Sequence, residues 1–317
     1  MKTDSAPATT IVATPGRLEW PEEKALPKRN ATFAHIMSRI KSVLKHVGLL
    51  AAAVTMIYPV VWMVVSSFRP ADRIFREPGL IASDFTTDNY VYGWDALSYG
   101  ALDLPFGLFM TNSMIVVIGC IIGNVFSCSL AAYAFARLKF TARTILFAAM
   151  LLTIMLPSHV VLVPQYIIFS KLGLVGTFWP LILPKLLATD SFFIFLMVQF
   201  IRGLPKELDE AALIDGCGHF RIFFNIIMPL MVPAIATTAI FTFIWTWNDF
   251  FGSMIYLQGN PRMYTVQLGL RAFQDSAGST NWGSIFAMSV LSLVPIFLAF
   301  LFGQRFLIKG IATTGIK

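Results

Sequence analysis

Between two hydrophobic runs of the chain lies the charged stretch Leu204-Pro-Lys-Glu-Leu-Asp-Glu-Ala-Ala-Leu-Ile-Asp-Gly-Cys-Gly218. Pro205 suits the first turn of a helix, and the acidic residues that follow it suit the positive N-terminal end of the helix dipole. Gly216 and Gly218 are typical of the point where a helix stops and the chain turns. A second short helix over residues 219–228 is expected to lead into the next apolar run. The stretch therefore predicts two short helices, joined by a glycine turn, at a membrane face.

The composition is that of a membrane protein. Apolar residues make up 56% of the chain and charged residues 13%, and the mean hydropathy of +0.71 lies far outside ordinary soluble usage. A membrane-spanning helix needs about 20 mostly apolar residues. Six runs meet this requirement: residues 47–66, 109–135, 145–169, 181–201, 222–248 and 285–304. Because the runs are continuous and do not alternate with polar residues, they predict helices and not barrel strands. The expected fold is an all-α polytopic membrane protein with six transmembrane helices.

The basic residues predict the orientation in the membrane. If the N-terminus is cytosolic, 17 of the 24 lysines and arginines fall in cytosolic segments, as the positive-inside rule requires. Both termini and the charged stretch are then cytosolic. This asymmetry, together with the attraction of basic residues to anionic membrane lipid, accounts for the net charge of +7. Since no nucleic-acid-binding motif accompanies the charge, no nucleic acid partner is expected.

Three short motifs occur here with the spacing found in a known protein family: Glu210-Ala-Ala212, Asp215-Gly216 and Met228-Pro-Leu230. Matching segments elsewhere lie at residues 155–158, 163–166, 179–184, 247–250 and 304–310. Together they resemble the EAA loop and neighbouring motifs of ABC importer permeases, in particular the carbohydrate-importer subunits of the maltose type, over about residues 45–317. The resemblance implies the ABC importer permease fold in the cytoplasmic (inner) membrane, with a cytosolic coupling loop at about residues 202–228.

The resemblance also implies which residues of this loop couple to the ATPases: Glu207, Glu210, Ala211, Ala212, Asp215 and Gly216. Glu210 would pair with a basic residue of an ATPase subunit. Ala211 and Ala212 would permit close approach of the partner, and Gly216 would allow the turn.

The implied assembly contains a second homologous permease subunit, two ABC ATPase subunits docked on the cytosolic loops, and a soluble solute-binding protein outside. The chain itself has no Walker A motif, no metal-binding spacing of Cys and His, and no nucleophile elbow. It is therefore expected to be a translocation subunit and not an enzyme. Catalytic and metal-ligating residues and a bound cofactor are not expected, because ATP and Mg²⁺ would bind to the ATPase subunits. The expected cargo is a carbohydrate or a related polyol.

Five polar residues in or beside the apolar runs are candidates for the solute path: Asn112, Asn124, Asp190, Thr246 and Asn248. Asn in a membrane more often joins helices than binds cargo, and this is the alternative for Asn112 and Asn124. Thr246 and Asn248 flank Trp247, which is expected, with Phe251, in an aromatic belt at the membrane interface.

Two further runs carry breaks or charges. Lys185 and Asp190 interrupt the fourth run; being five residues apart, they are not expected to share a helical face. Lys185 is expected at the outer interface, and Asp190 is expected to pair across helices or to contact a sugar hydroxyl. In the third run, Pro157 and Pro164 flank His159. The carbonyls that such breaks free favour a transport path, with a packed kink as the alternative.

The second run contains small residues that suit close helix packing, among them Gly119, Gly123 and Ser127. Cys120 and Cys128 are eight residues apart on this run, too far along one helix to form a disulfide. They are expected to be small packing residues.

Two parts of the chain are expected: a cytosolic N-terminal extension at residues 1–45 and the permease domain at residues 46–317. Residues 1–32, rich in Pro, Ala, Thr and charged residues, are predicted to be disordered. Residues 35–46 fit either an amphipathic helix on the membrane surface or the start of the first span. The outside loop at residues 259–282 is the natural contact for a solute-binding protein.

Other functions stay open at this point. The first alternative is an importer of the same kind whose cargo is phosphate, a peptide or an amino acid. An ion-coupled secondary carrier is a second alternative, but such a carrier should show internal repeats and intramembrane coupling charges. No clear repeat is present, and only Asp190 and Asp249 are candidates for such charges. A membrane enzyme, the third alternative, lacks a reactive cluster.

Overall fold

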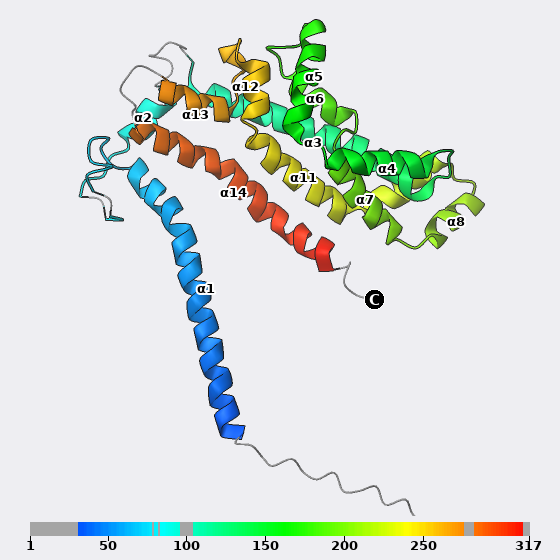
Figure 1. Ribbon diagram of the computed structural model, residues 1–317, viewed down its shortest axis with the longest axis horizontal. Helices are drawn as coiled ribbons and strands as arrows, with labels where there is room; N and C mark the ends of the chain where they lie inside the picture. Colours follow the sequence, from blue (N-terminus) through cyan, green and yellow to red (C-terminus); the bar gives the residue numbers. More distant parts are fainter. Residues whose placement is uncertain (1–30, 78, 82, 96–103, 276–281, 313–317) are drawn as a thin grey trace, which may run out of the picture. The chain divides into compact units, whose positions relative to one another are not determined.

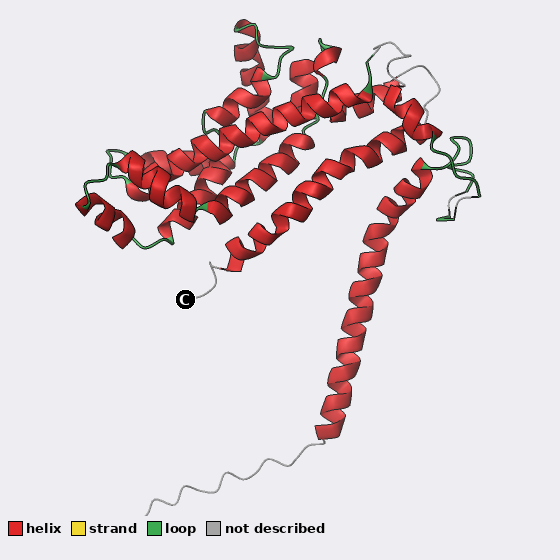
Figure 2. Ribbon diagram, turned by 180° about the vertical axis from the view of Figure 1, so that it is seen from behind, coloured by secondary structure: helices red, strands yellow, loops and turns green. Residues whose placement is uncertain are grey.

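The computed structural model describes residues 31–77, 79–81, 83–95, 104–275 and 282–312. Within these ranges all regular secondary structure is helical (Figure 2). The helices in chain order are α1 (Ala31–Ser67), α2 (Asp88–Asp95), α3 (Phe106–Arg137), α4 (Arg143–Ile154), α5 (Ser158–Lys171), α6 (Trp179–Leu186), α7 (Ser191–Arg202), α8 (Glu207–Ile214), α9 (His219–Ile222), a π-helical segment (Phe223–Ile227), α10 (Met228–Leu230), α11 (Val232–Trp247), α12 (Phe251–Leu257), a 3₁₀ turn (Pro261–Met263), α13 (Val266–Asp275) and α14 (Trp282–Ala312).

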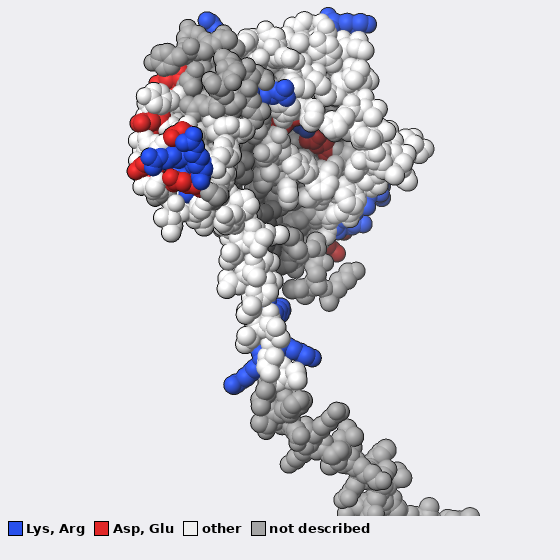
Figure 3. All heavy atoms as spheres, turned by 60° about the vertical axis from the view of Figure 1, so that its left-hand side comes forward, with Lys and Arg blue, Asp and Glu red and all other residues white. Residues whose placement is uncertain are grey.

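Four helical segments are long and apolar enough to cross a membrane: Met37–Ser67, Phe106–Arg137, Trp179–Arg202 and Trp282–Phe306. Two pairs pass the same test together but are bent, α4 with α5 by 104° and the segment His219–Leu230 with α11 by 76°. If each bent pair is one span, the described residues contain the six spans that the sequence predicts. Figure 3 shows the corresponding surface, on which uncharged residues cover wide areas and charged side chains gather in a few patches.

Contacts within the chain divide it into two units, Met1–Tyr58 and Pro59–Lys317. In the first unit, every described side chain from residue 37 onward is exposed, although most are apolar, which is typical of a helix that lies in lipid. Helix α1 runs through residues 35–46 without a break, so this segment begins the first membrane helix. The boundary near residue 45 stays a prediction, and the predicted disorder of residues 1–32 falls almost entirely outside the described residues.

Helix α3 is central to the second unit. It packs against α6, α7, α11 and α13, while α11 packs on α14 and α14 packs on α2. Figure 1 shows α3, α11 and α14 running alongside one another, with α2 and α13 at one end of this unit and α8 at the other. The long-range contacts of α3 therefore join elements from both ends of the bundle.

Trp247 is buried in the core, so its predicted place in an interfacial belt is wrong. Its side chain is 1% exposed and stacks on Phe243 with ring centroids 5.6 Å apart. The indole nitrogen donates a hydrogen bond to the Ser292 carbonyl of α14 at 3.1 Å. The hydrogen bond explains how an indole fits a core, because its single polar group has a partner there. Phe251, by contrast, is half exposed.

Small residues on α3 let the α6 backbone approach closely, as their spacing predicts. A Cβ at Gly123 would lie 3.0 Å from the backbone of Lys185 and Leu186. A Cβ at Gly119 would lie nearest to the Ile182 side chain, 2.8 Å from Cδ1 and 3.2 Å from both Cγ atoms. One turn beyond Gly123, the Ser127 hydroxyl donates to the Lys185 carbonyl at 2.7 Å. The two glycines and the hydroxyl form what we call the glycine face of α3.

We predict that Gly123→Ala destabilises the protein by about 1–3 kcal/mol, the usual range for overpacking. Gly119→Ala is the matched control: it makes the same change on the same helix, with the same gain in helix propensity, but opposite a flexible side-chain end that can move. Thermal unfolding of the purified variants measures the difference. Equal melting temperatures for the two variants would contradict the role given to the α6 backbone.

Candidate functional site

A cavity of about 1010 Å³ lies among α3, α4, α5, α6, α7, α11 and α12, at the upper end of the range of small-molecule sites. Three interruptions between helices face it. The α4–α5 break contributes Leu156, the α6–α7 break contributes residues 188–190, and the α11–α12 break contributes Asp249. In a membrane, an interrupted helix is tolerated where its free backbone groups line a cavity or find protein partners. The breaks therefore explain why polar groups reach the interior here.

The lining combines polar side chains with aromatic rings. The polar residues are Thr153, His159, Gln165, Lys185, Thr189, Asp190, Ser191, Thr246, Asp249 and Ser253, and the aromatic residues are Phe192, Trp245, Phe251 and Tyr256. The His159 ring meets the edge of Phe251 at 5.2 Å, and Trp245 lies 5.6 Å from Phe192. The cavity thus offers ring faces beside hydrogen-bonding groups.

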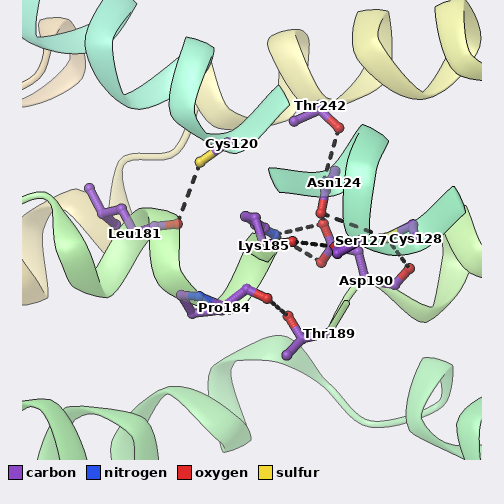
Figure 4. A network of polar contacts seen from close by, with 10 residues as sticks. All are labelled: Cys120, Asn124, Ser127, Cys128, Leu181, Pro184, Lys185, Thr189, Asp190 and Thr242. Carbon is purple, nitrogen blue, oxygen red and sulfur yellow. Dashed lines mark hydrogen bonds and ion pairs between the residues drawn. The ribbon is translucent and has the colours of Figure 1, made fainter. Parts of the chain in front are cut away.

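Lys185 and Asp190 form an ion pair on the wall of this cavity (Figure 4). The Lys185 Nζ atom lies 2.8 Å from each carboxylate oxygen of Asp190. Asn124 of α3 donates to the same carboxylate at 2.6 Å and to the Thr242 hydroxyl of α11 at 3.1 Å. The pair and its amide partner therefore join α3, α6, α11 and the start of α7.

The prediction that Lys185 and Asp190 lie on different faces is wrong because it assumed an unbroken helix. Helix α6 ends at Leu186 and α7 begins at Ser191, and Ala188 between them adopts a positive φ of 56°. This local break changes the directions of the side chains that follow it, and the Lys185 and Asp190 side chains meet. The predicted pairing of Asp190 across helices is seen in the contact with Asn124, and the position of Lys185 at the outer interface stays a prediction.

The other path candidates are placed unequally around the cavity. Thr246 and Asp190 both line the cavity. Asn124 does not line it but donates a hydrogen bond to Asp190. Asn112 is buried and donates to the carbonyls of Arg262 and Tyr264 at 2.8 and 3.0 Å, so it anchors a loop. Asn248 is exposed and donates to the Ile244 carbonyl of its own helix. Contact of any of these residues with a solute stays a prediction.

Most polar residues of the lining were not among the predicted path candidates, His159, Gln165 and Asp249 included; Asp249 was considered only as a coupling charge. Asp249 was visible as a rare charge after an apolar run, and the structure shows its carboxylate accepting a hydrogen bond from the Gly252 backbone at 3.0 Å. His159 was visible between two prolines. Their common location follows from packing between α5 and α12, which no local pattern encodes.

The charged stretch forms α8 and a turn, as predicted, and the predicted second helix over residues 219–228 begins as α9 and continues as the π-helical segment over residues 223–227. Gly216 has φ +76°; its N–H bonds the Leu213 carbonyl, and the next N–H bonds the Ala212 carbonyl, which is a Schellman motif. Of the predicted coupling residues, Glu207, Glu210, Ala211, Asp215 and Gly216 are exposed. Ala212 is buried, so its small side chain serves the packing of α8 on the bundle.

Arg137, at the end of α3, contacts α8 and the residues that precede it. Its Nε atom lies 2.8 Å from a carboxylate oxygen of Asp209, with the two side chains only 6% and 13% exposed. Its Nη2 atom donates to the Leu204 carbonyl at 2.8 Å. Burial raises the pKa of the Asp209 carboxyl, an effect that the nearby Arg137 charge opposes, while the Glu210 charge adds to it. Neither residue was selected from the sequence, because they are far apart along the chain.

Membrane-crossing helices around a partly polar cavity, with a short acidic helix exposed on one loop, define the chain as a membrane transport protein. The family model described as "Binding-protein-dependent transport system inner membrane component" matches residues 123–312. The chain belongs to this family.

Individual relatives agree with the family. The "Probable ABC transporter permease protein YurM" of Bacillus subtilis is 35% identical over 82% of this chain and 83% of the relative. The "Arabinooligosaccharides transport system permease protein AraQ" of Halalkalibacterium halodurans is 33% identical over 88% of this chain and 98% of the relative. Among solved structures, a bacterial ABC transporter "involved in the import of the acidic polysaccharide alginate" matches with a TM-score of 0.74 at 18% identity, over 86% of this chain and 98% of the other. The last likeness confirms the ABC permease fold.

We predict that Lys185→Met and Asp190→Leu each destabilise the protein by roughly 1.5–3 kcal/mol, the range for hydrogen bonds to charged groups. Each change leaves one charge of a partly buried pair without its partner. The double variant removes both charges and should lose less than the sum of the two. Thermal unfolding of the four proteins gives the cycle, and strictly additive losses would show that the pair contributes no coupling.

Proposed function

We propose that this chain is one of two membrane subunits of an ATP-driven, binding-protein-dependent importer whose cargo is an uncharged carbohydrate or polyol. The observation that carries the proposal is the cavity, where Trp245, Phe251 and Tyr256 lie among hydroxyl, amide and carboxylate groups. Sugars present C–H faces that stack on aromatic rings and hydroxyl groups that need hydrogen-bond partners, so this lining matches both of their surfaces. The carbohydrate cargo in the name of AraQ supports the same class.

The charges of the lining favour an uncharged cargo. Among the described residues that line the cavity, Lys185 is the one lysine or arginine, and its ammonium group contacts both carboxylate oxygens of Asp190. Asp249 adds a second carboxyl group. An anionic solute would meet carboxylates without a free cation, and like charges at an interface cost several kcal/mol. The alginate importer shows that the fold itself also serves an acidic cargo. The choice of an uncharged cargo therefore rests on the residues that line the cavity and not on the fold.

The proposed assembly supplies the energy from outside this chain. Two ATPase subunits dock on the loops of the two membrane subunits, with α8 as the docking helix here, and a solute-binding protein delivers the cargo on the opposite face. Both termini are cytosolic in this arrangement, in agreement with the distribution of basic residues. ATP binding closes the ATPase pair and draws the two loops together, and the bundle switches its access by largely rigid-body motion.

The structure supports an ion-coupled carrier less well than it supports an ATP-driven importer. Such a carrier needs an intramembrane charge that can bind the coupling ion. Asp190 is engaged by Lys185 and Asn124, and Asp249 accepts a backbone hydrogen bond. The family to which the chain belongs is also one of binding-protein-dependent systems.

Cells that contain the complete system should take up uncharged oligosaccharides or polyols at least about tenfold faster than size-matched sugars that carry a carboxylate or phosphate, because like-charge contacts cost more than 1.4 kcal/mol. Uptake of a radiolabelled panel measures this, with cells that lack only this chain as the control. Uptake that depends on this chain but is confined to the anionic sugars would refute an uncharged cargo.

Gly216→Val should weaken ATPase docking and transport, because valine at φ +76° strains the turn by about 1–3 kcal/mol. Gly218→Val is the matched control: a Cβ meets nothing within 4 Å at either glycine, but Gly218 has φ −75°. Co-purification of the ATPase with each variant, after equal membrane insertion is verified, makes the comparison. Full docking by Gly216→Val would mean that the turn does not shape the docking surface.

A further inference from the structure

Arg137 holds the coupling helix by two independent kinds of contact. The ion pair with Asp209 fixes the first turn of α8, and the hydrogen bond to the Leu204 carbonyl fixes the non-helical approach to it. The Pro205 carbonyl also lies 3.5 Å from the guanidinium. One side chain at the end of α3 therefore grips both the helix and the segment that leads into it.

The burial of this contact makes it stiff. Removing a guanidinium and a carboxylate from water is unfavourable unless each finds its partner, so a displacement that separates them leaves two uncompensated charges. The Nε contact with Asp209 is an ion pair that is not aligned as a hydrogen bond; the directional contact of the guanidinium is the hydrogen bond from Nη2 to the Leu204 carbonyl. Apart from the Arg137 contacts, α8 is held by the packing of buried Ala212 in the core and by the short non-helical segment at residues 203–206.

Helix α3 connects this grip to the cavity. It runs without an internal proline from Phe106 to Arg137. Asn124 lies 13 residues before Arg137, which corresponds to about 20 Å along a straight helix, and donates to Asp190 on the cavity wall. The same helix therefore contacts the coupling helix at its end and the Lys185–Asp190 pair near its middle (Figures 1 and 4).

We infer that Arg137 is a positioning residue that makes α8 and α3 move as one body, so that a displacement of α8 reaches the ion pair on the cavity wall. The inference rests on the proposed function of α8 as the docking helix. Spatial continuity alone does not prove energetic coupling, so the link requires a direct measurement. Two questions are measured separately: whether α8 is held on α3, and whether ATP displaces α8.

The test is a spin-label distance between Ile214 on α8 and Ile122 on α3, both exposed, in a complete complex whose Cys120, Cys128 and Cys217 have been replaced. With Arg137 present, one narrow distance distribution is expected, unchanged by ATP. With Arg137→Gln, the distribution should broaden already without nucleotide. Arg143→Gln is the control, because Arg143 donates to the Leu138 carbonyl and not to α8, and it should leave the distribution narrow.

Asp209→Asn tests the same contact from the α8 side, with almost no change of shape, should Arg137→Gln fail to assemble. In either variant the ATP hydrolysed per solute imported should rise by about twofold or more, since α8 can then move without α3. A merely structural role would lower the yield of complex and leave this ratio unchanged. A narrow distribution in both variants, with and without ATP, would overturn the inference.

The proposed function is judged separately, by a second label pair between Ile214 and Leu298 on α14. If ATP leaves this second distance unchanged in the complex with Arg137, α8 is not the element that ATP moves. The nucleotide-free comparison of Arg137→Gln with Arg143→Gln still decides whether Arg137 holds α8 on α3.

Discussion

The approach of α6 to the glycine face of α3 is the contact on which the arrangement around the cavity depends. Because Gly123 has no Cβ, the α6 backbone can lie against it, and the Ser127 hydroxyl closes the contact at the Lys185 carbonyl. This fixes the last turn of α6 and therefore the point from which the Lys185 side chain starts. Without the glycine face, the ammonium group would be set back from Asp190 and the break after α6 would lose its anchor.

The break between α6 and α7 is satisfied by side chains, which is the condition for interrupted helices in a membrane. The Ser127 hydroxyl donates to the Lys185 carbonyl at the end of α6, and the Thr189 hydroxyl adds to the backbone hydrogen bonds that the Pro184 carbonyl accepts. The Asp190 carboxylate, which this break turns toward the cavity, is neutralised by Lys185 and held by Asn124. The same break thus places polar groups on the cavity wall and brings them beside the hydrogen-bond partners that they need.

The sequence predicts what depends on neighbouring residues. Apolar runs of sufficient length identify the spans, and the glycine after an acidic helix identifies the turn at Gly216, because helix termination is a local event. The Lys185–Asp190 pair was missed because one unexpected break changes which residues face each other. The Arg137–Asp209 contact and the burial of Trp247 were missed for a different reason: their partners are distant in sequence, so no periodicity records them. The predicted coupling residues, in contrast, lie together because they share one short helix and its cap.

Helix α3 contacts two ion pairs, through Arg137 at its end and through Asn124 near its middle, and their positions explain why a chain with so few charges keeps them at least partly buried. A buried pair adds little net stability over apolar residues of the same size, but separating its members is strongly unfavourable. Apolar side chains can slide past one another at small energetic expense, whereas separating a guanidinium from a carboxylate leaves two charges without partners. A bundle that changes access by rigid-body motion needs parts that keep their relative positions while others move. Charges at the two places where α3 meets α8 and the cavity wall meet that need, and apolar packing alone would not.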